Sequence, residues 1–504
     1  MNDTAKITLS ADAVISKIDE RLYSSFIEHM GRAVYTGIYE PGHPSADANG
    51  FRRDVVELIR PLAIPCIRYP GGNFVSGYRW EDGVGPREAR PVRADLAWQA
   101  IEPNLVGTNE FMDFLALVGA RPMLAVNLGT RGAQSAADMV EYCNFPGGTR
   151  LSGLRAAHGY PKPHQVGLWC LGNEMDGPWQ ICAKTAEEYG RLAHESAKMM
   201  RWLDPDIELV VCGSSFRAMP TFGAWERTVL RHCYDDADYL SLHTYYQNRD
   251  GDVPSFLANS VRMDGLIREV RAICREIKAE KGSQKEMYLS FDEWNVWYHF
   301  QKDGAPPAKW TVARPIEEEL YDFADALLVG GMLITLINNA DFVKIACLAQ
   351  LVNTLAPIMT QPGGKAWAQT TYYPFLHTSQ RGRGTALKAE LDAPRYACDA
   401  GEAFPFIDMA AVLSEDNGGI TLFLVNKNLC QDVVCEVELN GFERPRLMEW
   451  IALHGHPLDA VNTAEHAAVR PAAYDGGLRY DGRAARFTLP KASWNMIRLA
   501  VRRG

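Results

Sequence analysis

From about residue 20 to residue 385, short apolar runs alternate with amphipathic helical patterns along the chain. Eight of the runs are strand-like, and several are nearly continuous rather than alternating, which is typical of parallel strands buried on both faces. These runs cover residues 22–30, 64–70, 122–128, 166–174, 208–215, 239–245, 287–293 and 344–350. Eight such strands with helices between them predict a closed (β/α)8 barrel of the TIM type.

The clearest helical pattern lies between the fourth and fifth apolar runs. Thr185 and Glu188 have the spacing of a capping box, in which two side chains satisfy backbone N–H groups of the first helical turn. Apolar residues then recur at helical spacing as far as Leu203. We therefore expect a helix from Thr185 to Leu203, and similar patterns predict helices within residues 52–62 and 135–145.

After about residue 385 the pattern changes to strands separated by turn signals, and no helical period remains. Examples are residues 419–428, 433–441 and 493–501. This tail predicts an antiparallel β-sandwich, jelly-roll-like, which an opening strand at residues 6–12 would complete. We expect residues 18–385 to form the catalytic barrel and residues 1–17 with 386–504 to form the sandwich. The chain has no long flexible linker, so the two domains should pack rigidly.

Composition and charge narrow the class of protein. The 504 residues are 47% hydrophobic and 23% charged, which is ordinary for a soluble globular protein. The formal net charge of −10 leaves no basic surplus for a phosphate backbone, so nucleic acid is not an expected partner. No apolar run is long enough to span a membrane, and residues 1–14 lack the pattern of an export signal. With eleven cysteines and no CxxC pair, we expect free thiols and a cytoplasmic location.

Polar side chains stand at the ends of six of the predicted strands. In a TIM barrel the loops that follow the strands gather on one rim, and active sites lie there. A single polar residue at such a position can equally cap the next helix or solvate a loop, but six together indicate a site. They are Glu28 and His29, Arg68 and Asn73, Asn173 and Glu174, His243 and Tyr245, Glu293, and Gln350.

Two of these residues, Glu174 and Glu293, point to a reaction. A pair of carboxylic acids on separate rigid strands is the minimal set for splitting a glycosidic bond, because one protonates the leaving oxygen and the other attacks or activates water. Asn173 can hydrogen-bond a sugar hydroxyl beside the reacting carbon, and His243 and Tyr245 can orient a carboxylate. Chain order alone does not say which glutamate has which role.

Aromatic residues follow both glutamates: Trp179 after Glu174, and Trp294, Trp297 and Tyr298 after Glu293. Such rings can serve as platforms for sugar faces. Aromatic side chains are, however, more often part of the core. Both interpretations stay open at this point.

Several segments resemble the α-L-arabinofuranosidases of glycoside hydrolase family 51. They run in order along the barrel at residues 25–47, 67–86, 170–180, 241–246, 291–298 and 349–360, and residues 493–499 are similar to the end of the family's C-terminal sandwich. The resemblance implies that the glutamate after an asparagine at the end of strand 4, Glu174, is the acid/base. It implies that the glutamate at the end of strand 7, Glu293, is the nucleophile.

The resemblance also implies the remaining site residues. Sugar-binding positions fall on Glu28, Asn73, Asn173, Tyr245 and Gln350; His243 would support the nucleophile, and Arg68, Trp98 and Trp297 would line the pocket. Gln247 and the loop at residues 301–314 depart from the family pattern at the edge of the site, so the preferred linkage stays open.

The implied activity is exo-acting. The resemblance predicts release of terminal non-reducing α-L-arabinofuranosyl residues, with net retention, from arabino-oligosaccharides derived from arabinan or arabinoxylan. Because an export signal is lacking, we expect these oligosaccharides to be imported. It also implies a homo-oligomer, commonly a hexamer. The partner expected here is a small-molecule sugar, with no metal and no cofactor.

Rival functions remain. An endo-β-1,4-glucanase or a β-xylosidase would keep the barrel and both glutamates, and a long open cleft would favour the glucanase. A metal-dependent hydrolase is disfavoured because the sequence has no HExxH motif, and no GxGxxG follows a predicted strand to bind a dinucleotide. A rival from another class is a catalytically inactive carbohydrate-binding protein.

Overall fold

Eight parallel strands close into a barrel in the computed structural model, which describes residues 4–298, 307–416, 418–482 and 484–503. The strands are β2 (Ser24–Phe26), β3 (Cys66–Tyr69), β6 (Arg121–Val126), β7 (Leu168–Leu171), β8 (Glu208–Val211), β9 (Tyr239–Tyr246), β10 (Tyr288–Val296) and β11 (Val343–Ala349). Each overlaps one predicted run, so the (β/α)8 barrel is confirmed. The ring closes where β11 pairs with β2.

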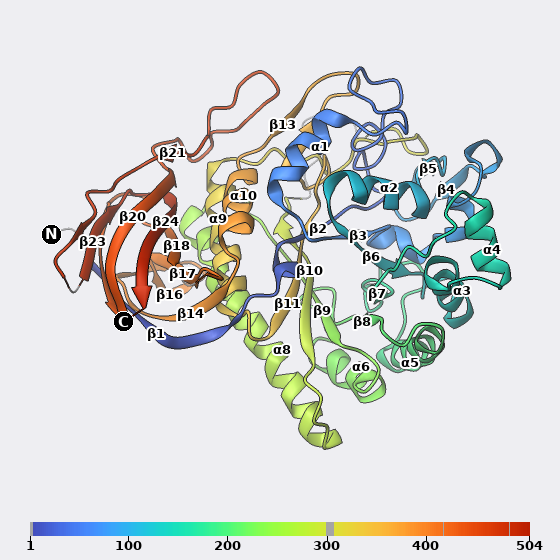
Figure 1. Ribbon diagram of the computed structural model, residues 1–504, viewed down its shortest axis with the longest axis horizontal. Coiled ribbons are helices and arrows are strands. Elements are labelled where there is room, and N and C mark those ends of the chain that lie inside the picture. Colours follow the sequence, from blue (N-terminus) through green and yellow to red (C-terminus); the bar gives the residue numbers. More distant parts are fainter. Residues whose placement is uncertain (1–3, 299–306, 417, 483, 504) are drawn as a thin grey trace.

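Helices surround the barrel on its outside (Figure 1). They are α1 (Arg53–Ile59), α2 (Thr108–Val118), α3 (Ala133–Asn144), α4 (Arg150–Ala157), α5 (Ala186–Leu203), α6 (Ala224–Cys233), α7 (Val253–Leu257), α8 (Asn259–Lys281), α9 (Phe323–Asn338) and α10 (Tyr372–Arg381). The predicted capping box of α5 is present, because the Glu188 N–H donates to Thr185 Oγ1 at 3.3 Å and the Thr185 N–H donates to Glu188 Oε2 at 2.9 Å. Helices α1, α3 and α5 coincide with the three helices predicted from the sequence, so these predictions are confirmed.

Short elements occupy the loops. They comprise the hairpins β4 (Arg93–Asp95) with β5 (Ala100–Glu102), β12 (Ile358–Thr360) with β13 (Ala366–Ala368) and β15 (Arg395–Cys398) with β16 (Gly401–Pro405), and the 3-10 helices η1 (Glu20–Tyr23), η2 (Arg60–Leu62), η3 (Asn73–Ser76), η4 (Trp80–Gly83) and η5 (Arg87–Ala89). Of the loop at residues 301–314, residues 301–306 lie outside the described residues. The loops at the end of the barrel where strands finish carry most of the candidate site.

A ten-stranded sheet beside the barrel contains the first and the last strands of the described residues (Figure 1). In order across the sheet the strands are β21 (Ala472–Ala473), β20 (Phe442–Leu453), β24 (Ser493–Arg503), β18 (Gly419–Asn426), β17 (Ile407–Leu413), β14 (Thr385–Asp392), β1 (Thr4–Lys17), β19 (Val433–Asn440), β23 (Ala484–Leu489) and β22 (Arg479–Tyr480). The expected opening strand is β1. It pairs antiparallel with β14 and parallel with β19, so this curled sheet is mixed rather than purely antiparallel.

Strands β17 and β18 are apolar on both faces because each face has its own core. Met409 and Ala411 of β17 belong to the cluster inside the curled sheet. Ala410 and Val412, on the opposite face, belong to the cluster that the sheet shares with the barrel. The barrel and the sheet therefore share a continuous apolar layer.

Helix α9 lies between the barrel and the sheet, and this position explains why the helix is so apolar. Every residue from Phe323 to Ile337 is buried. Within the described ranges, no helix has the length and hydropathy that a membrane span requires. The apolar sequence of α9 is accounted for by burial between the two domains.

Gly330 in α9 allows this close packing, and its replacement is expected to destabilise the protein. A Cβ at position 330 would lie 2.3 Å from Cδ1 of Trp494 in β24. Because Trp494 is fully buried, Gly330→Ala should lower the free energy of unfolding by about 1–3 kcal/mol, measured by thermal or denaturant unfolding. Gly153→Ala in α4 is the matched control, since a Cβ there meets nothing within 4 Å. Equal stability of the two variants would contradict the proposed role of this contact.

Candidate active site

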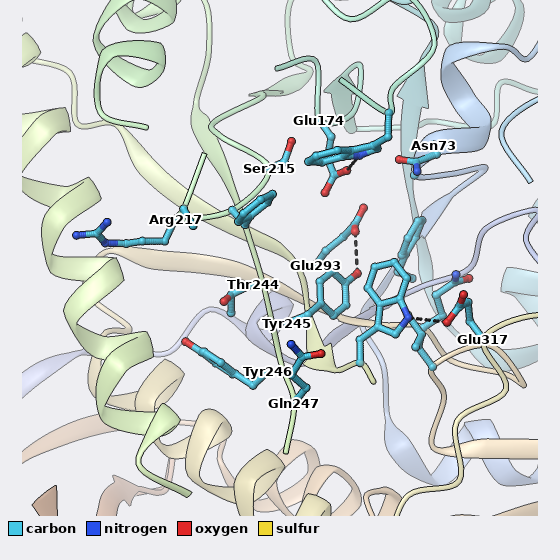
Figure 2. A pocket seen from close by; sticks show the side chains of 18 of the residues that line it. Asn73, Glu174, Ser215, Arg217, Thr244, Tyr245, Tyr246, Gln247, Glu293 and Glu317 are labelled. Carbon is cyan, nitrogen blue, oxygen red and sulfur yellow. Dashed lines mark hydrogen bonds between the residues drawn. The ribbon is translucent and has the colours of Figure 1, made fainter. Parts of the chain in front are cut away.

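A cavity of about 1460 Å³ opens at the end of the barrel where the strands finish (Figure 2). Most of the predicted site residues line it: Glu28, Asn73, Trp98, Glu174, Tyr245, Glu293, Trp297 and Gln350. Gln247, one of the departures from the family pattern, lines it too. Of the other predicted residues, Arg68, Asn173 and His243 are almost fully buried behind the two glutamates. His29 is also buried and does not line the cavity, because its ring is hydrogen-bonded to Glu102 and Tyr69. Arg68 was expected to line the pocket, and it instead supports residues that do.

Glu293 is held at both carboxylate oxygens. Arg68 Nη1 donates to Glu293 Oε1 at 2.6 Å, and the Tyr245 hydroxyl donates to Glu293 Oε2 at 2.7 Å. The second nitrogen of the same guanidinium, Nη2, donates to Asn173 Oδ1 at 2.6 Å. Because a guanidinium is a rigid planar fork, Arg68 fixes the position of Glu293 relative to Asn173. The Glu293 side chain has little rotational freedom left.

Glu174 lies on the turn that follows β7. Its backbone has φ +45°, in the left-handed region that non-glycine residues rarely adopt, and such strain is concentrated at functional sites. The carboxylate is hydrogen-bonded at both oxygens, to His243 Nδ1 at 3.0 Å and to Trp179 Nε1 at 2.8 Å. The turn thus presents Glu174 to the cavity at the point where the buried strand ends.

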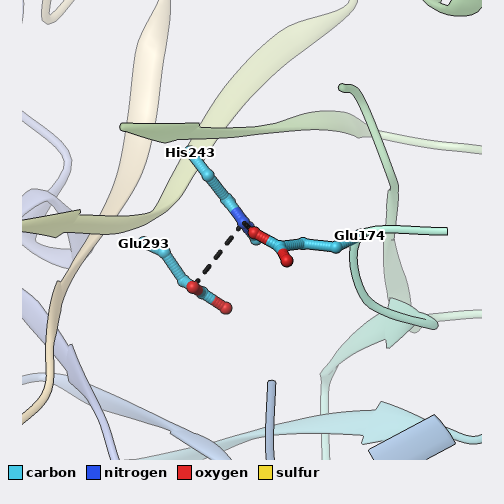
Figure 3. A group of neighbouring side chains, drawn as sticks. All are labelled: Glu174, His243 and Glu293. Carbon is cyan, nitrogen blue, oxygen red and sulfur yellow. Dashed lines mark hydrogen bonds and ion pairs between the residues drawn. The ribbon is translucent and has the colours of Figure 1, made fainter. Parts of the chain in front are cut away.

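The two glutamates approach each other closely, with His243 beside both (Figure 3). One carboxylate oxygen of Glu174, one of Glu293 and a ring nitrogen of His243 all lie within 4.8 Å of one another. Two carboxyl groups about 5–5.5 Å apart leave no room for a water molecule between one of them and the sugar, whereas inverting pairs lie roughly 6.5–9.5 Å apart. The arrangement has the spacing of a retaining pair.

The same three residues also have the chemistry of a metal-ligand set, and a metal ion at this place would have to compete with a proton for His243. Burial alone would lower the pKa of His243, but the charge of Glu293 and the hydrogen bonds to Asp292 and Glu174 together raise it to about 10. An imidazolium has a proton on each nitrogen and no lone pair to give to a metal ion. His243 therefore serves here as a cation between carboxylates.

Asp292 lies behind this group and was not assigned a role from the sequence. It is fully buried, its Oδ1 accepts from Ser241 Oγ at 2.5 Å, and His243 Nε2 lies 3.1 Å from the same oxygen. Burial alone would raise the pKa of Asp292, but Arg68 and His243 lower it below its usual value. Asp292 thus adds to the negative charge of Glu293 that holds His243 as a cation.

A β-bulge explains why Asp292 was missed. Side chains alternate between the two faces of a strand, so Asp292 and Glu293 should point in opposite directions. The pairing register of β10 shifts at this point against both neighbours, between Ser290 and Glu293 on the β9 side and between Phe291 and Trp294 on the β11 side. Bulges re-aim side chains next to active sites, and this one brings both carboxylates to the inside of the barrel.

Glu28 forms the opposite wall of the cavity. Its Oε1 accepts from the Phe74 N–H at 2.9 Å and from Trp98 Nε1 at 2.9 Å, while its own N–H donates to Gln350 Oε1 at 2.8 Å. Gly72 lies so close that a Cβ there would be 2.1 Å from Glu28 Oε2, which explains a glycine at that position. Burial raises the pKa of Glu28 to about 8.

Glu28 should therefore make stability depend on pH. The folded protein keeps the Glu28 proton up to about pH 8, whereas the unfolded chain loses it near the ordinary pKa of 4.5. Relative to Glu28→Gln, the wild type should lose stability as pH rises through this window, by about 1.4 kcal/mol per unit at most, and the difference should be constant above it. Melting temperatures of both proteins from pH 5 to 9 test this, and parallel curves would contradict it.

Trp98 is carried by the hairpin of β4 and β5. The Asp95 carboxylate accepts from the N–H groups of Ala97 at 2.9 Å and Trp98 at 3.3 Å, and Arg314 Nη1 donates to the Trp98 carbonyl at 3.0 Å. The hairpin is thus fixed from two sides. The indole N–H of Trp98 donates to Glu28, so Trp98 and Glu28 together form one wall of the cavity.

The aromatic residues after the glutamates divide between core and cavity. Trp294 is fully buried in the core, and the Tyr298 hydroxyl donates to Asp325 at 2.6 Å. Trp297 lines the cavity, donates to Glu317 Oε2 at 2.7 Å and packs edge-on against Tyr245. Trp179 is 46% exposed at the cavity rim and stacks on Phe216 at a ring-centroid distance of 5.8 Å. Trp179 and Trp297 are therefore the available platforms.

Two family models match the chain. One, described as the α-L-arabinofuranosidase 1 domain, matches residues 58–263, and the other, the α-L-arabinofuranosidase C-terminal domain, matches residues 292–493. The second begins inside β10, so its limits do not follow the structural division between barrel and sheet. Together the two models cover most of the barrel and most of the sheet.

Similar proteins span the full chain. An intracellular exo-α-(1→5)-L-arabinofuranosidase of Halalkalibacterium halodurans is 52% identical over 99% of both chains. An exo-α-(1→6)-L-arabinofuranosidase of Bifidobacterium longum is 46% identical over 98% of this chain and 97% of its own. The solved structure of a family 51 α-L-arabinofuranosidase from Bifidobacterium longum superposes with a TM-score of 0.94 at 40% identity, covering 99% of this chain and 100% of that one. The chain belongs to the α-L-arabinofuranosidases of glycoside hydrolase family 51.

Proposed function

We propose that this protein is an exo-acting α-L-arabinofuranosidase that releases terminal non-reducing arabinofuranosyl residues from arabino-oligosaccharides with retention of configuration. The observation that carries the proposal is the close pair of carboxylates, Glu174 and Glu293, at the cavity of a family 51 chain. The names of the relatives, all exo-acting arabinofuranosidases where the linkage is given, support the substrate class.

The reaction is a double displacement. In the first step a Glu293 oxygen attacks the anomeric carbon while Glu174 protonates the departing oxygen, which leaves a covalent glycosyl ester on Glu293. In the second step Glu174 removes a proton from water, the water oxygen attacks the anomeric carbon, and Glu293 leaves as a carboxylate. Two inversions give net retention.

The resemblance implies that His243 supports the nucleophile. In the structure its Nδ1 is hydrogen-bonded to Glu174 and lies 3.7 Å from Glu293 Oε2, so we also assign it a role toward Glu174 between these steps. After Glu174 has given up its proton, its Oε1 faces Nδ1 of a protonated imidazole at 3.0 Å. A charge-assisted hydrogen bond stabilises this carboxylate until it acts as a base. Asp292 and Arg68 are positioning residues, because they act through His243 and Glu293 and do not line the cavity.

The sugar itself is bound by the residues around the pair. Glu28, Asn73 and Gln350 offer hydrogen-bonding groups to ring hydroxyls, with Trp98 and Trp297 on the walls. Asn173, fixed by Arg68, lies 3.4 Å from Asn73 and supports the binding of the hydroxyl next to the reacting carbon. These roles follow the assignments that the family resemblance implies.

Four further proposals complete this function. Residues 18–385 are the catalytic domain, and residues 1–17 with 386–504 are its structural partner. The enzyme acts inside the cell, as the name of the relative from Halalkalibacterium halodurans supports. It needs no metal and no cofactor. Assembly into a homo-oligomer, a hexamer, stays a prediction, tested by light scattering of the purified protein.

The test of the activity is nitrophenol release from p-nitrophenyl α-L-arabinofuranoside, β-D-xyloside and β-D-glucoside. A strong preference for the arabinofuranoside is expected. Preference for the xyloside or the glucoside would indicate a β-xylosidase or an endoglucanase with the same barrel fold. No release from any of the three would favour an inactive carbohydrate-binding protein.

A further inference from the structure

The cavity continues well past the catalytic pair. Its volume of about 1460 Å³ exceeds the roughly 300–1,000 Å³ of pockets that hold a drug-sized ligand, and one pentose is smaller than such a ligand. Beyond Glu174 and Glu293 it is bounded by the segments that follow β8 and β9 and by one face of α8. Figure 2 shows Arg217 reaching toward the yellow-green helix α8, on the opposite side of the pocket from Asn73 and Glu317. We call this part the aglycone arm, made of Phe216, Arg217, Arg249, Arg262, Gly265 and Glu269.

The face of α8 that lines the aglycone arm has no side chain at its centre. Residues 259, 262, 265, 266 and 269 line the cavity at helical spacing, and position 265 is a glycine. A glycine inside a helix costs roughly 1 kcal/mol relative to alanine. Gly265 has no positive φ, and a Cβ there would meet nothing within 4 Å. Neither backbone conformation nor packing requires this glycine, and what it does is leave room in the cavity.

The arm carries more positive than negative charge, in a chain whose formal net charge is −10. Arg217 is paired with Glu269 at 2.8 Å. Among the described residues, Arg249 and Arg262 have no carboxylate within ion-pair distance; Arg249 donates to the Tyr298 carbonyl at 3.0 Å, and Arg262 donates to Asn259 Oδ1 at 3.3 Å. Asp250 is the further acid that lines this part of the cavity. The guanidinium groups of Arg249 and Arg262 therefore line the cavity and have further N–H groups that can donate to a ligand.

We propose that the aglycone arm binds an oligosaccharide aglycone that carries a uronic acid, with the uronate carboxylate held by Arg262 and Arg249. The proposal rests on the proposed arabinofuranosidase activity and names the substrate class of the same site. Guanidinium groups present a planar set of donors that matches a carboxylate. The stacked pair Trp179 and Phe216, both partly exposed at the cavity, supplies the apolar face for the sugar between the cleaved bond and the acid.

The first test compares two arabino-oligosaccharides of equal length, one with a uronic acid on the aglycone and one neutral. Wild-type kcat/KM should be higher for the acidic substrate by about tenfold or more, the size expected of hydrogen bonds to a charged group, and the ratio should fall as NaCl is added. Arg262→Gln should bring the ratio close to one. A wild-type ratio of one at low salt would overturn the role of the carboxylate.

The second test fills the arm. Gly265→Trp should lower kcat/KM for the acidic oligosaccharide relative to that for p-nitrophenyl α-L-arabinofuranoside by about tenfold or more, because the indole occupies the space of the distal sugars. Reading this ratio removes any general change in activity. Gly153→Trp in α4 is the matched control, also inside a helix with open space around it, and should keep the wild-type ratio.

The outcomes separate the two proposals. If the wild type does not release nitrophenol from the arabinofuranoside, the proposed function fails. If it does, and Gly265→Trp keeps the wild-type ratio, only the aglycone arm is wrong. Loss of the ratio in Gly265→Trp together with loss of acid preference in Arg262→Gln supports it.

Discussion

Glu293→Ala is expected to lower kcat for p-nitrophenyl α-L-arabinofuranoside by about 10⁴- to 10⁶-fold, the range seen when a catalytic nucleophile is removed. The physical reason is that alanine has no carboxylate to form the glycosyl ester of the first step. Arg68 and Tyr245 hold Glu293 at both oxygens, and neither has a carboxylate to replace it. Stopped or continuous measurement of nitrophenol release gives the rate.

Azide distinguishes loss of the nucleophile from loss of the fold. The truncated side chain leaves a space beside Arg68 into which a small anion fits, so azide should restore turnover and yield the glycosyl azide of inverted configuration. Glu317→Ala is the control, because Glu317 lines the same cavity but bonds to Trp297. That variant should keep far more activity and should not respond to azide. Retained activity in Glu293→Ala, or an azide product of retained configuration, would contradict the nucleophile assignment.

Glu174→Ala is expected to affect substrates according to their leaving groups. General acid catalysis contributes about 10²- to 10⁴-fold, and a sugar hydroxyl needs that proton whereas nitrophenolate leaves without it. The loss in kcat/KM should therefore be larger by about that factor for an arabino-oligosaccharide than for the nitrophenyl substrate. Because kcat/KM reports the step in which the leaving group departs, this comparison isolates the acid role from the later role as a base.

Trp179→Phe is the matched control for Glu174→Ala. It removes the hydrogen bond to Glu174 Oε2 and keeps an aromatic ring against Phe216. Its losses on the two kinds of substrate should be small and similar. Equal losses on both kinds in Glu174→Ala would show that Glu174 is not the acid.

Much of the fold was predictable because local patterns encode it. Continuous apolar runs such as residues 166–174 mark strands that are covered on both faces, and all eight overlap barrel strands. Thr185 and Glu188 marked the start of α5, since a capping box involves only residues three apart. The change of period from helix to strand predicted a domain boundary at about residue 385, which stays a prediction.

The location of the site was predictable as well, and the roles depended on the family resemblance. A polar residue directly after a buried strand of a barrel has to lie on the rim, so Glu174, Glu293 and Gln350 could be placed together without knowing any contact. Nothing in the residue pattern separated the acid from the nucleophile. That distinction came from the resemblance alone.

What the sequence determined by itself was the eight barrel strands, the helices α1, α3 and α5, and the strand ends that carry Glu174 and Glu293, because periodicity and neighbouring residues decide these. The tertiary structure decided what depends on segments far apart in the chain. Strand β1 pairs in parallel with β19. A β-bulge in β10 turns Asp292 toward the inside of the barrel, although side chains in a regular strand alternate between the two faces. Barrel closure placed Arg68 behind Glu293 rather than on the cavity wall. Register, bulges and the burial of charged side chains such as Arg68 arise from packing between strands, and no local pattern contains them.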